Sequence, residues 1–198
     1  MAAILNCSEN GSIPEAARVL GSGSLVVVPT DTVYGLAADP RIAGAKERIC
    51  MAKSRAASKP IALLVSNVDE VEKRGGILNT RAKRLADRFW PGALTIVVEA
   101  GDSTQGFRVP DHPVMLSLLE LVGGALYVTS ANLSGEEPAC TAKEAAELFG
   151  SHVAAVLDAG TLTGREPSTV VKSDGEAVTI LREGAVPRRE IEKWATGW

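Results

Sequence analysis

The stretch 25–36 reads Leu-Val-Val-Val-Pro-Thr-Asp-Thr-Val-Tyr-Gly-Leu and joins a short apolar run to a cluster of polar side chains. A compact, β-branched run that ends at a proline, as 25–28 does, is typical of a buried strand. The hydroxyls of Thr30, Thr32 and Tyr34 follow at once, beside Asp31. Short polar groups in such a place either bind a ligand or cap the neighbouring backbone, and this stretch alone is compatible with both interpretations.

A second stretch repeats this arrangement. Thr129-Ser130-Ala131-Asn132 follows the apolar run 125–128, and Ser134-Gly135 completes a turn. In open α/β sheets, ligands bind in loops at the carboxyl ends of strands. Two polar loops in equivalent places therefore favour a binding role for each.

A loop rich in positive charge lies between these stretches. Lys53, Arg55 and Lys59 follow a helical pattern that ends near residue 52. If the segment is extended, the side chains of Lys53 and Arg55 point the same way. Clustered cations repel one another unless an anion lies between them, and an arginine fork combined with lysine point charges suits a triphosphate. A loop of solvated charges is the alternative.

Two arginines end predicted strands, Arg108 before Val109-Pro110 and Arg182 before Glu183-Gly184. Each is either a ligand clamp or an ordinary surface charge. Ser168 lies in Pro167-Ser168-Thr169, which opens another strand, and it either contacts a ligand or forms a turn.

The charge balance is uneven along the chain. The 198 residues carry a net charge of −3, yet 41–90 holds twelve Lys and Arg against five Asp and Glu, which leaves about −10 for the rest. A local basic field inside an acidic protein suits an anionic ligand at one site better than a broad coating of nucleic acid. Other cations of this segment are predicted to lie on solvated helix faces: Lys73, Arg74, Arg81, Lys83 and Arg84.

Several classes of protein are excluded by composition and motif. Every apolar run is far shorter than the roughly 20 residues that span a bilayer, and 1–10 does not resemble a secretory signal, so we expect a cytoplasmic protein. The cysteines at 7, 50 and 140 have neither Cys-x-x-Cys nor metal-ligand spacing, which indicates reduced, buried thiols. The chain contains no P-loop and no Rossmann fingerprint.

Catalytic constellations that depend on proton abstraction are also missing. No Ser-His-Asp, Cys-His or paired-carboxylate arrangement stands out, and His112 and His152 have ordinary structural explanations. Phosphoryl and nucleotidyl transfers, usually with Mg²⁺, need little proton abstraction and much neutralisation of phosphate charge. They fit this inventory of residues.

Alternating apolar runs and helical patterns predict one α/β (α+β) domain over 1–198, built around a mixed, twisted sheet. The strands are expected at 25–28, 61–65, 94–98, 107–109, 125–128, 154–157, 169–171 and 178–181. The helices are expected at 14–20, 40–52, 79–89, 113–122, 141–149 and 187–194, the second with Asp39 as N-cap and Pro40 at the first helical position.

Taken in order, these motifs resemble the YrdC-like family, the threonylcarbamoyl-adenylate synthases of the TsaC or Sua5 type. The resemblance covers about 12–190 and rests on 29–36, Lys53-Ser54-Arg55 with Lys59-Pro60, 89–95, 108–110, 130–135, 167–169 and 182–184. Longer members carry a second C-terminal domain, which we do not expect here after Trp198. Some relatives place a histidine after the strand at 61–65, where this chain has Ser66-Asn67.

The resemblance implies a twisted mixed sheet flanked by helices, a basic concave cavity and a reaction. L-threonine, bicarbonate and ATP give threonylcarbamoyl-adenylate and pyrophosphate, and a downstream transferase complex uses that product to form N6-threonylcarbamoyladenosine at position 37 of tRNA. The implied residues are Lys53 and Arg55 as catalytic groups; Lys53, Arg55, Lys59, Ser130, Asn132, Ser168 and Arg182 for ATP; and Thr30, Tyr34, Arg108 and Thr129 for threonine. Mg²⁺ would arrive on the ATP phosphates, without protein ligands.

Two alternatives stand beside the synthase. One is a module that binds double-stranded RNA or tRNA weakly through phosphates, although aromatic residues that could stack on bases make up only 4% of the chain. The other is a paralogue that keeps the fold and lacks the activity.

Overall fold

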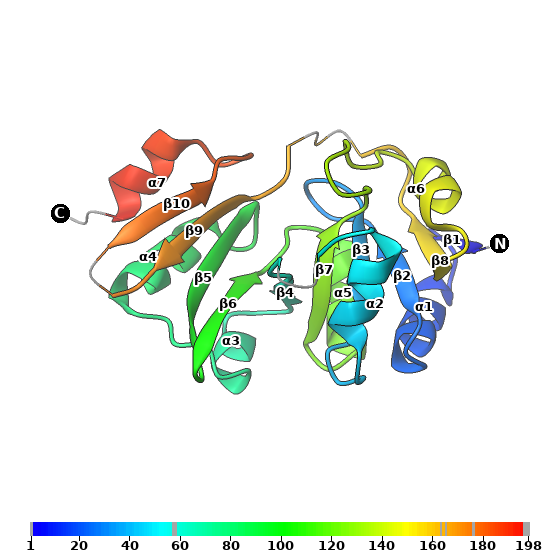
Figure 1. Cartoon of the computed structure of the whole chain (residues 1–198), viewed down its shortest axis with the longest axis horizontal. Helices are drawn as coiled ribbons and strands as arrows, with labels where there is room; N and C mark the ends of the chain where they lie inside the picture. Colours follow the sequence, from blue (N-terminus) through cyan, green and yellow to red (C-terminus); the bar gives the residue numbers. More distant parts are fainter. Residues whose placement is uncertain (1, 57–58, 163, 165, 176, 196–198) are drawn as a thin grey trace.

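The computed structural model describes residues 2–56, 59–162, 164, 166–175 and 177–195 (Figure 1). In this part of the chain, ten strands form one mixed sheet in the order β1-β8-β2-β3-β7-β4-β6-β5-β9-β10. The strands are β1 Ala3–Asn6, β2 Leu25–Val28, β3 Gly35–Ala38, β4 Ala62–Val65, β5 Leu94–Ala100, β6 Ser103–Arg108, β7 Ala125–Ser130, β8 Val153–Asp158, β9 Thr169–Ser173 and β10 Val178–Arg182. The helices are α1 Ser12–Gly21, α2 Ala45–Ala52, α3 Asp69–Lys73, α4 Thr80–Phe89, α5 Pro113–Leu121, α6 Ala142–Phe149 and α7 Arg188–Ala195.

The centre of the sheet brings the two polar loops together. β2 pairs antiparallel with β3, and β3 pairs antiparallel with β7, so β2 and β7 run parallel to each other. Their carboxyl ends therefore share one edge, where Gly35 lies opposite Ser130. The prediction that these loops occupy equivalent places is confirmed.

The side of the sheet that contains β2 is covered on both faces. Leu25 and Val27 join a core cluster with residues of α2 and α6, whereas Val26 and Val28 join one with residues of α1 and α5. Because alternate side chains of a strand face opposite ways, a strand between two helix layers must be apolar throughout. This explains the unbroken run at 25–28.

The strands on the other side of β4 are covered by helices on one face only. Leu94, Ile96 and Phe107 pack in a cluster with residues of α4 and α7. Their neighbours on the opposite face, among them Thr95 and Gly106, line a cavity. Figure 1 shows this half, β5, β6, β9 and β10 with α3, α4 and α7, separated from the other half by β4.

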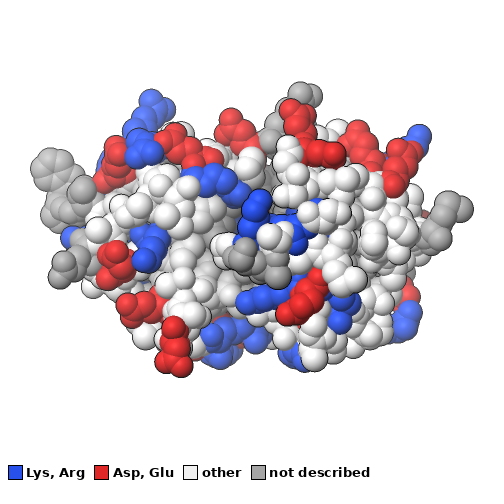
Figure 2. Space-filling model, viewed as in Figure 1, with Lys and Arg blue, Asp and Glu red and all other residues white. Residues whose placement is uncertain are grey.

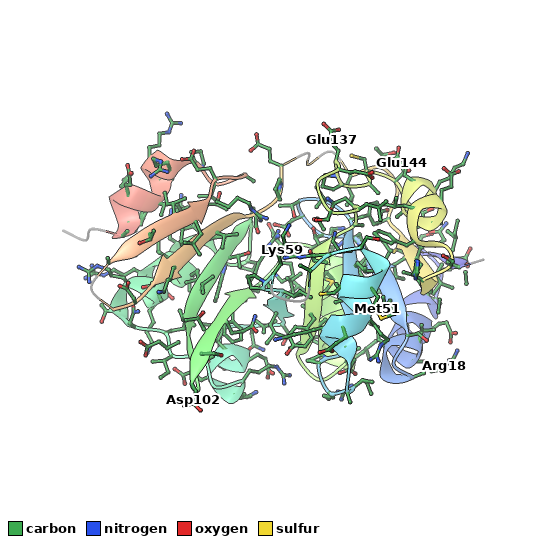
Figure 3. All side chains as sticks on the ribbon, viewed as in Figure 1. Arg18, Met51, Lys59, Asp102, Glu137 and Glu144 are labelled. Carbon is green, nitrogen blue, oxygen red and sulfur yellow. The ribbon has the colours of Figure 1, made fainter. Side chains whose placement is uncertain are left out.

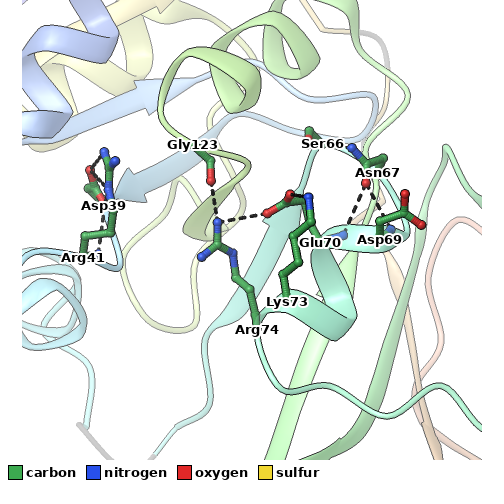
Figure 4. Close-up of polar contacts among 9 residues, drawn as sticks. All are labelled: Asp39, Arg41, Ser66, Asn67, Asp69, Glu70, Lys73, Arg74 and Gly123. Atoms are coloured by element: carbon green, nitrogen blue, oxygen red, sulfur yellow. Dashed lines mark hydrogen bonds and ion pairs between the residues drawn. The ribbon is translucent and has the colours of Figure 1, made fainter.

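The predicted start of the second helix was wrong. α2 begins at Ala45 after Gly44, whose φ of 75° is left-handed. Asp39 instead accepts a hydrogen bond from the Arg41 backbone at 2.9 Å and pairs with the Arg41 guanidinium at 2.6 Å (Figure 4). Short acidic side chains can bond the backbone two residues on and so favour a turn over a helix.

Three elements were not predicted: β1, β3 and α3. β3 reads Gly-Leu-Ala-Ala, a sequence with low intrinsic strand propensity, and it forms because β2 and β7 pair with it on either side. α3 has five residues, and the Asn67 side chain accepts hydrogen bonds from the first two backbone amides, Asp69 and Glu70, at 3.0 and 3.3 Å.

The prediction of solvated helix faces holds for Lys83 and Arg84, which are exposed, and was wrong for Arg74. The half-buried Arg74 guanidinium donates to Glu70 at 3.1 Å and to the Gly123 carbonyl at 2.5 Å, and so ties α3 to the turn after α5 (Figure 4). Arg81 is also half-buried, and its guanidinium donates to the Gly175 carbonyl at 2.8 Å.

The three thiols are unbonded to each other, and their burial differs from the prediction. Cys50 is buried, whereas Cys7 and Cys140 are only half-buried. No helix in the described ranges is long and apolar enough to cross a membrane.

Candidate active site

A cavity of about 540 Å³ lies between the two halves of the sheet. Figure 2 shows Lys and Arg side chains gathered near a hollow at the centre of the face in view, with acidic residues along its upper edge. Among the described residues, the cavity lining contains no Asp or Glu, and its cations are Lys46, Arg55, Arg108, Lys172 and Arg182. Lys and Arg side chains therefore supply all the charged groups of the described lining.

A smaller cavity of about 190 Å³ adjoins the large one. Arg55 and Ser130 line both cavities. Of the predicted site residues, eight line the large cavity: Thr30, Tyr34, Arg55, Arg108, Thr129, Ser130, Ser168 and Arg182. The other three, Lys53, Lys59 and Asn132, line the small one. The fold thus brings all eleven together at one continuous site.

The Lys-Ser-Arg segment is a helix-ending turn, not the extended stretch assumed above. The Arg55 amide donates to the Cys50 carbonyl at 2.9 Å and the Ser54 amide to the Met51 carbonyl at 3.2 Å. Ser54 itself has a left-handed φ of 49°. This is the bonding of a Schellman motif. Lys53 consequently lines only the small cavity, whereas Arg55 faces both.

The Lys53 side chain is 2% exposed and turned toward the loop after β7. Its ammonium donates to the Ser130 carbonyl, to the Asn132 carbonyl at 2.6 Å and to Asn132 Oδ1 at 3.0 Å. An ammonium has three donors, so all of them are used. Burial, followed by repulsion from Arg55, lowers the pKa of Lys53 to about 8.

Asn132 is the centre of this loop. Its Oδ1 also accepts a hydrogen bond from the Ser130 hydroxyl at 2.5 Å, and its Nδ2 donates to the carbonyls of Leu133 and Glu136 at 2.9 and 2.7 Å. The amide therefore fixes the direction of the Ser130 hydroxyl, which lines both cavities.

Arg55 and Lys59 contact only neutral groups among the described residues. The Arg55 guanidinium donates to Thr129 Oγ1 at 3.2 Å and to the Pro60 carbonyl at 3.0 Å. The exposed Lys59 ammonium lies 3.5 Å from Ser134 Oγ, and Lys59 is near the middle of the face in view (Figure 3). Within the described residues, no carboxylate therefore pairs with either cation at the small cavity.

Arg108 is neutralised by a carboxylate. Its side chain is almost fully buried, and its guanidinium donates to Asp31 at 2.6 Å, to Thr32 Oγ1 at 3.1 Å and to the Gly92 carbonyl at 2.9 Å. Burial lowers the pKa of Arg108, and the Asp31 charge opposes that shift. The pair fixes the 30–33 turn against the end of β6.

The hydroxyls of Thr30 and Tyr34 are engaged within the protein. Thr30 Oγ1 donates to the Val33 carbonyl at 2.6 Å, which is the hydrogen bond expected if Thr30 caps the neighbouring backbone. The Tyr34 hydroxyl donates to the Gly160 carbonyl at 2.8 Å and accepts from the Ala159 amide at 3.1 Å. Burial raises the pKa of Tyr34 to about 12. Any contact of these two residues with a ligand must use their remaining surface.

The far end of the large cavity is built on β5, β9 and β10. The Ser168 and Thr95 hydroxyls lie 2.8 Å apart, and the Arg182 guanidinium donates to the Ser168 carbonyl at 2.7 Å. The pKa of Arg182 is lowered by desolvation and by repulsion from Arg108 and Arg55. Three guanidinium groups therefore converge on one cavity, an arrangement that an anion would stabilise.

Several lining residues were not identified from the sequence, chiefly Thr95, Gly106 and Lys172. The signal for two of them was the alternation of their strands. Thr95 is the one polar residue in the run 94–98, and a Cβ on the neighbouring Gly106 would come within 3.2 Å of Thr95 Cγ2. This face of β5 and β6 is therefore the floor of a cavity, not a packed core.

No group of three or more His, Cys, Asp and Glu that could hold a metal occurs in the described part of the chain. That Mg²⁺ arrives with ATP stays a prediction.

These features define an α/β protein with a cation-lined, two-chambered site for a small anionic ligand. The family model Sua5_yciO_yrdC, described as "Telomere recombination", matches residues 18–184, and the chain belongs to this family. The threonylcarbamoyl-AMP synthase of Thiobacillus denitrificans is 34% identical over 174 residues, which cover 83% of this chain and 92% of that protein.

Solved structures agree with the family assignment. The structure of Pyrococcus abyssi Sua5 complexed with L-threonine is 32% identical in sequence and has a TM-score of 0.91. The match covers 98% of this chain and 60% of that chain. The structure of Escherichia coli YciO has a TM-score of 0.85, and the match covers 94% of this chain and 98% of that chain. At 24% identity, the YciO likeness shows the fold alone.

Proposed function

We propose that this chain is an L-threonylcarbamoyladenylate synthase, which makes threonylcarbamoyl-AMP and pyrophosphate from L-threonine, bicarbonate and ATP. The observation that carries this proposal is the pair of adjoining cavities bridged by Arg55 and Ser130. A large chamber for a nucleoside and an amino acid, next to a small cationic one for phosphates, matches the requirements of nucleotidyl transfer. Similarity to named synthases supports it.

The chemistry asks the protein for position and charge more than for proton transfer. The threonine nitrogen attacks the carbon of bicarbonate, water leaves, and a carbamate forms. A carbamate oxygen then attacks the α-phosphorus, and the bond to the bridging oxygen breaks as pyrophosphate departs. Arg55 and Lys59 would stabilise the charge that develops on the leaving group. Mg²⁺ bound to the phosphates would neutralise part of the same charge.

The remaining residues divide between the two chambers. Ser168 and Arg182 would hold the nucleotide at the β9–β10 end, with Ser130 and Asn132 at the junction. Thr129, Arg108, Thr30 and Tyr34 would surround threonine, the last two through surfaces other than their engaged hydroxyls. The complex of the Pyrococcus abyssi relative with L-threonine supports this amino acid as a substrate. A downstream transferase would move the threonylcarbamoyl group of the product to N6 of adenosine 37 of tRNA, with AMP as the leaving group.

A pyrophosphate-release assay tests the proposal. Purified protein is given ATP, Mg²⁺, L-threonine and bicarbonate, and each is omitted in turn. We expect release only with all four. Equal release without threonine would exclude the synthase, and no release with all four would favour a paralogue that keeps the fold alone. Serine should be a poorer substrate by roughly 1–3 kcal/mol, because the pocket loses contact with one methyl group.

The charge around the site disfavours the RNA-binding alternative. Exposed glutamates adjoin the lining residues in sequence: Glu136, Glu137, Glu166 and Glu183. Figure 2 shows acidic side chains along the edge above the basic hollow. An acidic rim repels a phosphate backbone but admits a small anion to the cavity. We therefore expect RNA binding to be weak and to fall steeply with salt.

A further inference from the structure

Lys53 is joined to the loop after β7 more closely than its place at a helix end requires. Besides the three bonds of its ammonium, the Lys53 carbonyl accepts from the Ser134 amide at 3.3 Å. Four hydrogen bonds thus connect one residue at the end of α2 with 130–134, a segment almost 80 residues further along the chain. Such a junction determines the shape of the loop.

The direction of the ammonium is set locally and leaves no donor for a ligand. The left-handed turn at Ser54 sends Lys53 and Arg55 different ways, and only Arg55 reaches the large cavity. At 2% exposure, Lys53 is enclosed by its three acceptors. For a phosphate oxygen to bind it, one of these partly buried carbonyl or amide oxygens would have to lose its partner, which is unfavourable.

Asn132 transmits the effect of Lys53. Its Oδ1 accepts from both the Lys53 ammonium and the Ser130 hydroxyl. Because the Ser130 hydroxyl donates its hydrogen to this Oδ1, its oxygen can still accept a hydrogen bond. Ser130 lines both cavities, so a polar ligand at their junction can donate that bond.

We propose that Lys53 is a positioning residue, whose ammonium, through Asn132, holds the 130–134 loop in the shape that presents Ser130 to ATP, and that it contacts no phosphate itself. Within the proposed function, Arg55 and Lys59 are then the residues of this segment that meet the phosphates. The inference rests on that function only in taking ATP as the ligand.

The experiment measures ATP affinity by calorimetry and amide hydrogen exchange at 131–134 without ligand. Lys53→Met keeps the length of the side chain and removes its donors, and Asn132→Ala removes the shared acceptor. We expect each to weaken ATP binding about tenfold and to speed exchange in the loop. Because the two substitutions remove the same Lys53–Asn132 interaction, their effects should not add, and the double variant should bind ATP about tenfold more weakly than wild type, as each single variant does. Lys83→Met, an exposed lysine on α4, is the matched control and should behave as wild type.

Two results would overturn the inference. If the two losses multiply in the double variant and exchange in the loop is unchanged, Lys53 contacts phosphate directly. If Lys53→Met speeds exchange and leaves ATP affinity intact, its role is structural only.

Lys53→Arg covers the case in which Lys53→Met fails to fold. Arginine keeps the charge but cannot direct three donors from a single nitrogen, so we expect ATP affinity to fall as it does in Lys53→Met. Full affinity in this variant would contradict the positioning role. Wild-type protein that binds ATP and releases no pyrophosphate would refute the proposed function and leave this comparison valid.

Discussion

The cations at the two ends of this site are neutralised in different ways. Arg108 is paired with Asp31 at 2.6 Å inside the protein, so the carboxylate neutralises this one cation of the large cavity. Lys53, Arg55 and Lys59 contact only hydroxyl, amide and carbonyl oxygens among the described residues, so no described carboxylate neutralises them, and Arg55 and Lys59 are left to meet a ligand. A buried ion pair builds a turn, whereas cations without a carboxylate attract an anion.

The largest effect should come from breaking the Arg108 pair. Asp31→Ala leaves a buried guanidinium without its carboxylate, which we expect to lower the free energy of unfolding by about 3–5 kcal/mol. Chemical denaturation measures this change. The double variant Asp31→Leu with Arg108→Met should recover most of the loss, since the uncompensated charge is gone. Unchanged stability in Asp31→Ala would mean that the two ends do not differ.

Arg55 should show the opposite pattern. Its bonds to a phosphate are worth about 1.5–3 kcal/mol, so Arg55→Ala should cost on the order of tenfold to a hundredfold in ATP-dependent turnover. Stability should hold, because the variant removes one of several neighbouring cations. Arg84→Ala on the exposed face of α4 is the control. If the two variants match in turnover, the phosphates bind elsewhere.

Removing the Lys53 side chain should change the stability of the protein, whereas removing that of Arg55 should not. The sequence predicts that its removal relieves repulsion and leaves stability unchanged or slightly higher. The structure reverses that expectation, because the ammonium satisfies three partly buried oxygens. We expect Lys53→Ala to lower the free energy of unfolding by about 1–3 kcal/mol. Thermal melts of Lys53→Ala and Arg55→Ala side by side would show the contrast, and equal melting temperatures would remove it.

The pH dependence of ATP affinity sharpens the same contrast. The pKa of Lys53 is lowered to about 8, so its amine is charged below that pH and neutral above it. A neutral amine donates two hydrogen bonds in place of three. Affinity should therefore fall about fivefold between pH 7 and 9, the equivalent of one hydrogen bond. In Lys53→Arg, which stays charged, this step should be absent.

The sequence predicts the fold well where packing and pattern agree. The strand at 25–28 is found to the residue because both its faces are buried, and Asn79 caps α4 as a start signal should, by accepting from the Ala82 amide at 3.0 Å. β3 was missed because its pairing comes from β2 and β7 and not from its own residues. Asp39 misled the prediction of α2 because the same side chain serves a cap or a turn.

The sequence predicts which residues lie at the site, but not what each side chain contacts there. Residues in the polar loops gather at one edge because the strands before them run parallel. Whether a hydroxyl is available depends on distant contacts, such as that of Tyr34 with Gly160, 126 residues away. The divergence of Lys53 and Arg55 depends on a left-handed residue, which a serine does not signal as a glycine would.

Ser54 gives the smallest effect and tests the cause of that divergence. A serine at φ 49° bears a left-handed cost of about 1 kcal/mol, whereas glycine adopts this conformation freely. Since glycine also gives the unfolded chain more freedom, worth about 0.5 kcal/mol, Ser54→Gly should raise the free energy of unfolding by about 0.5 kcal/mol with turnover unchanged. Ser54→Val is its counterpart, because a β-branched residue resists a positive φ and would push the turn toward helix or strand. Lys53 would then lose its acceptors, so ATP affinity should fall as in Lys53→Met. If Ser54→Val binds ATP as wild type does, the turn does not determine where the two cations point, and the difference between them has another origin.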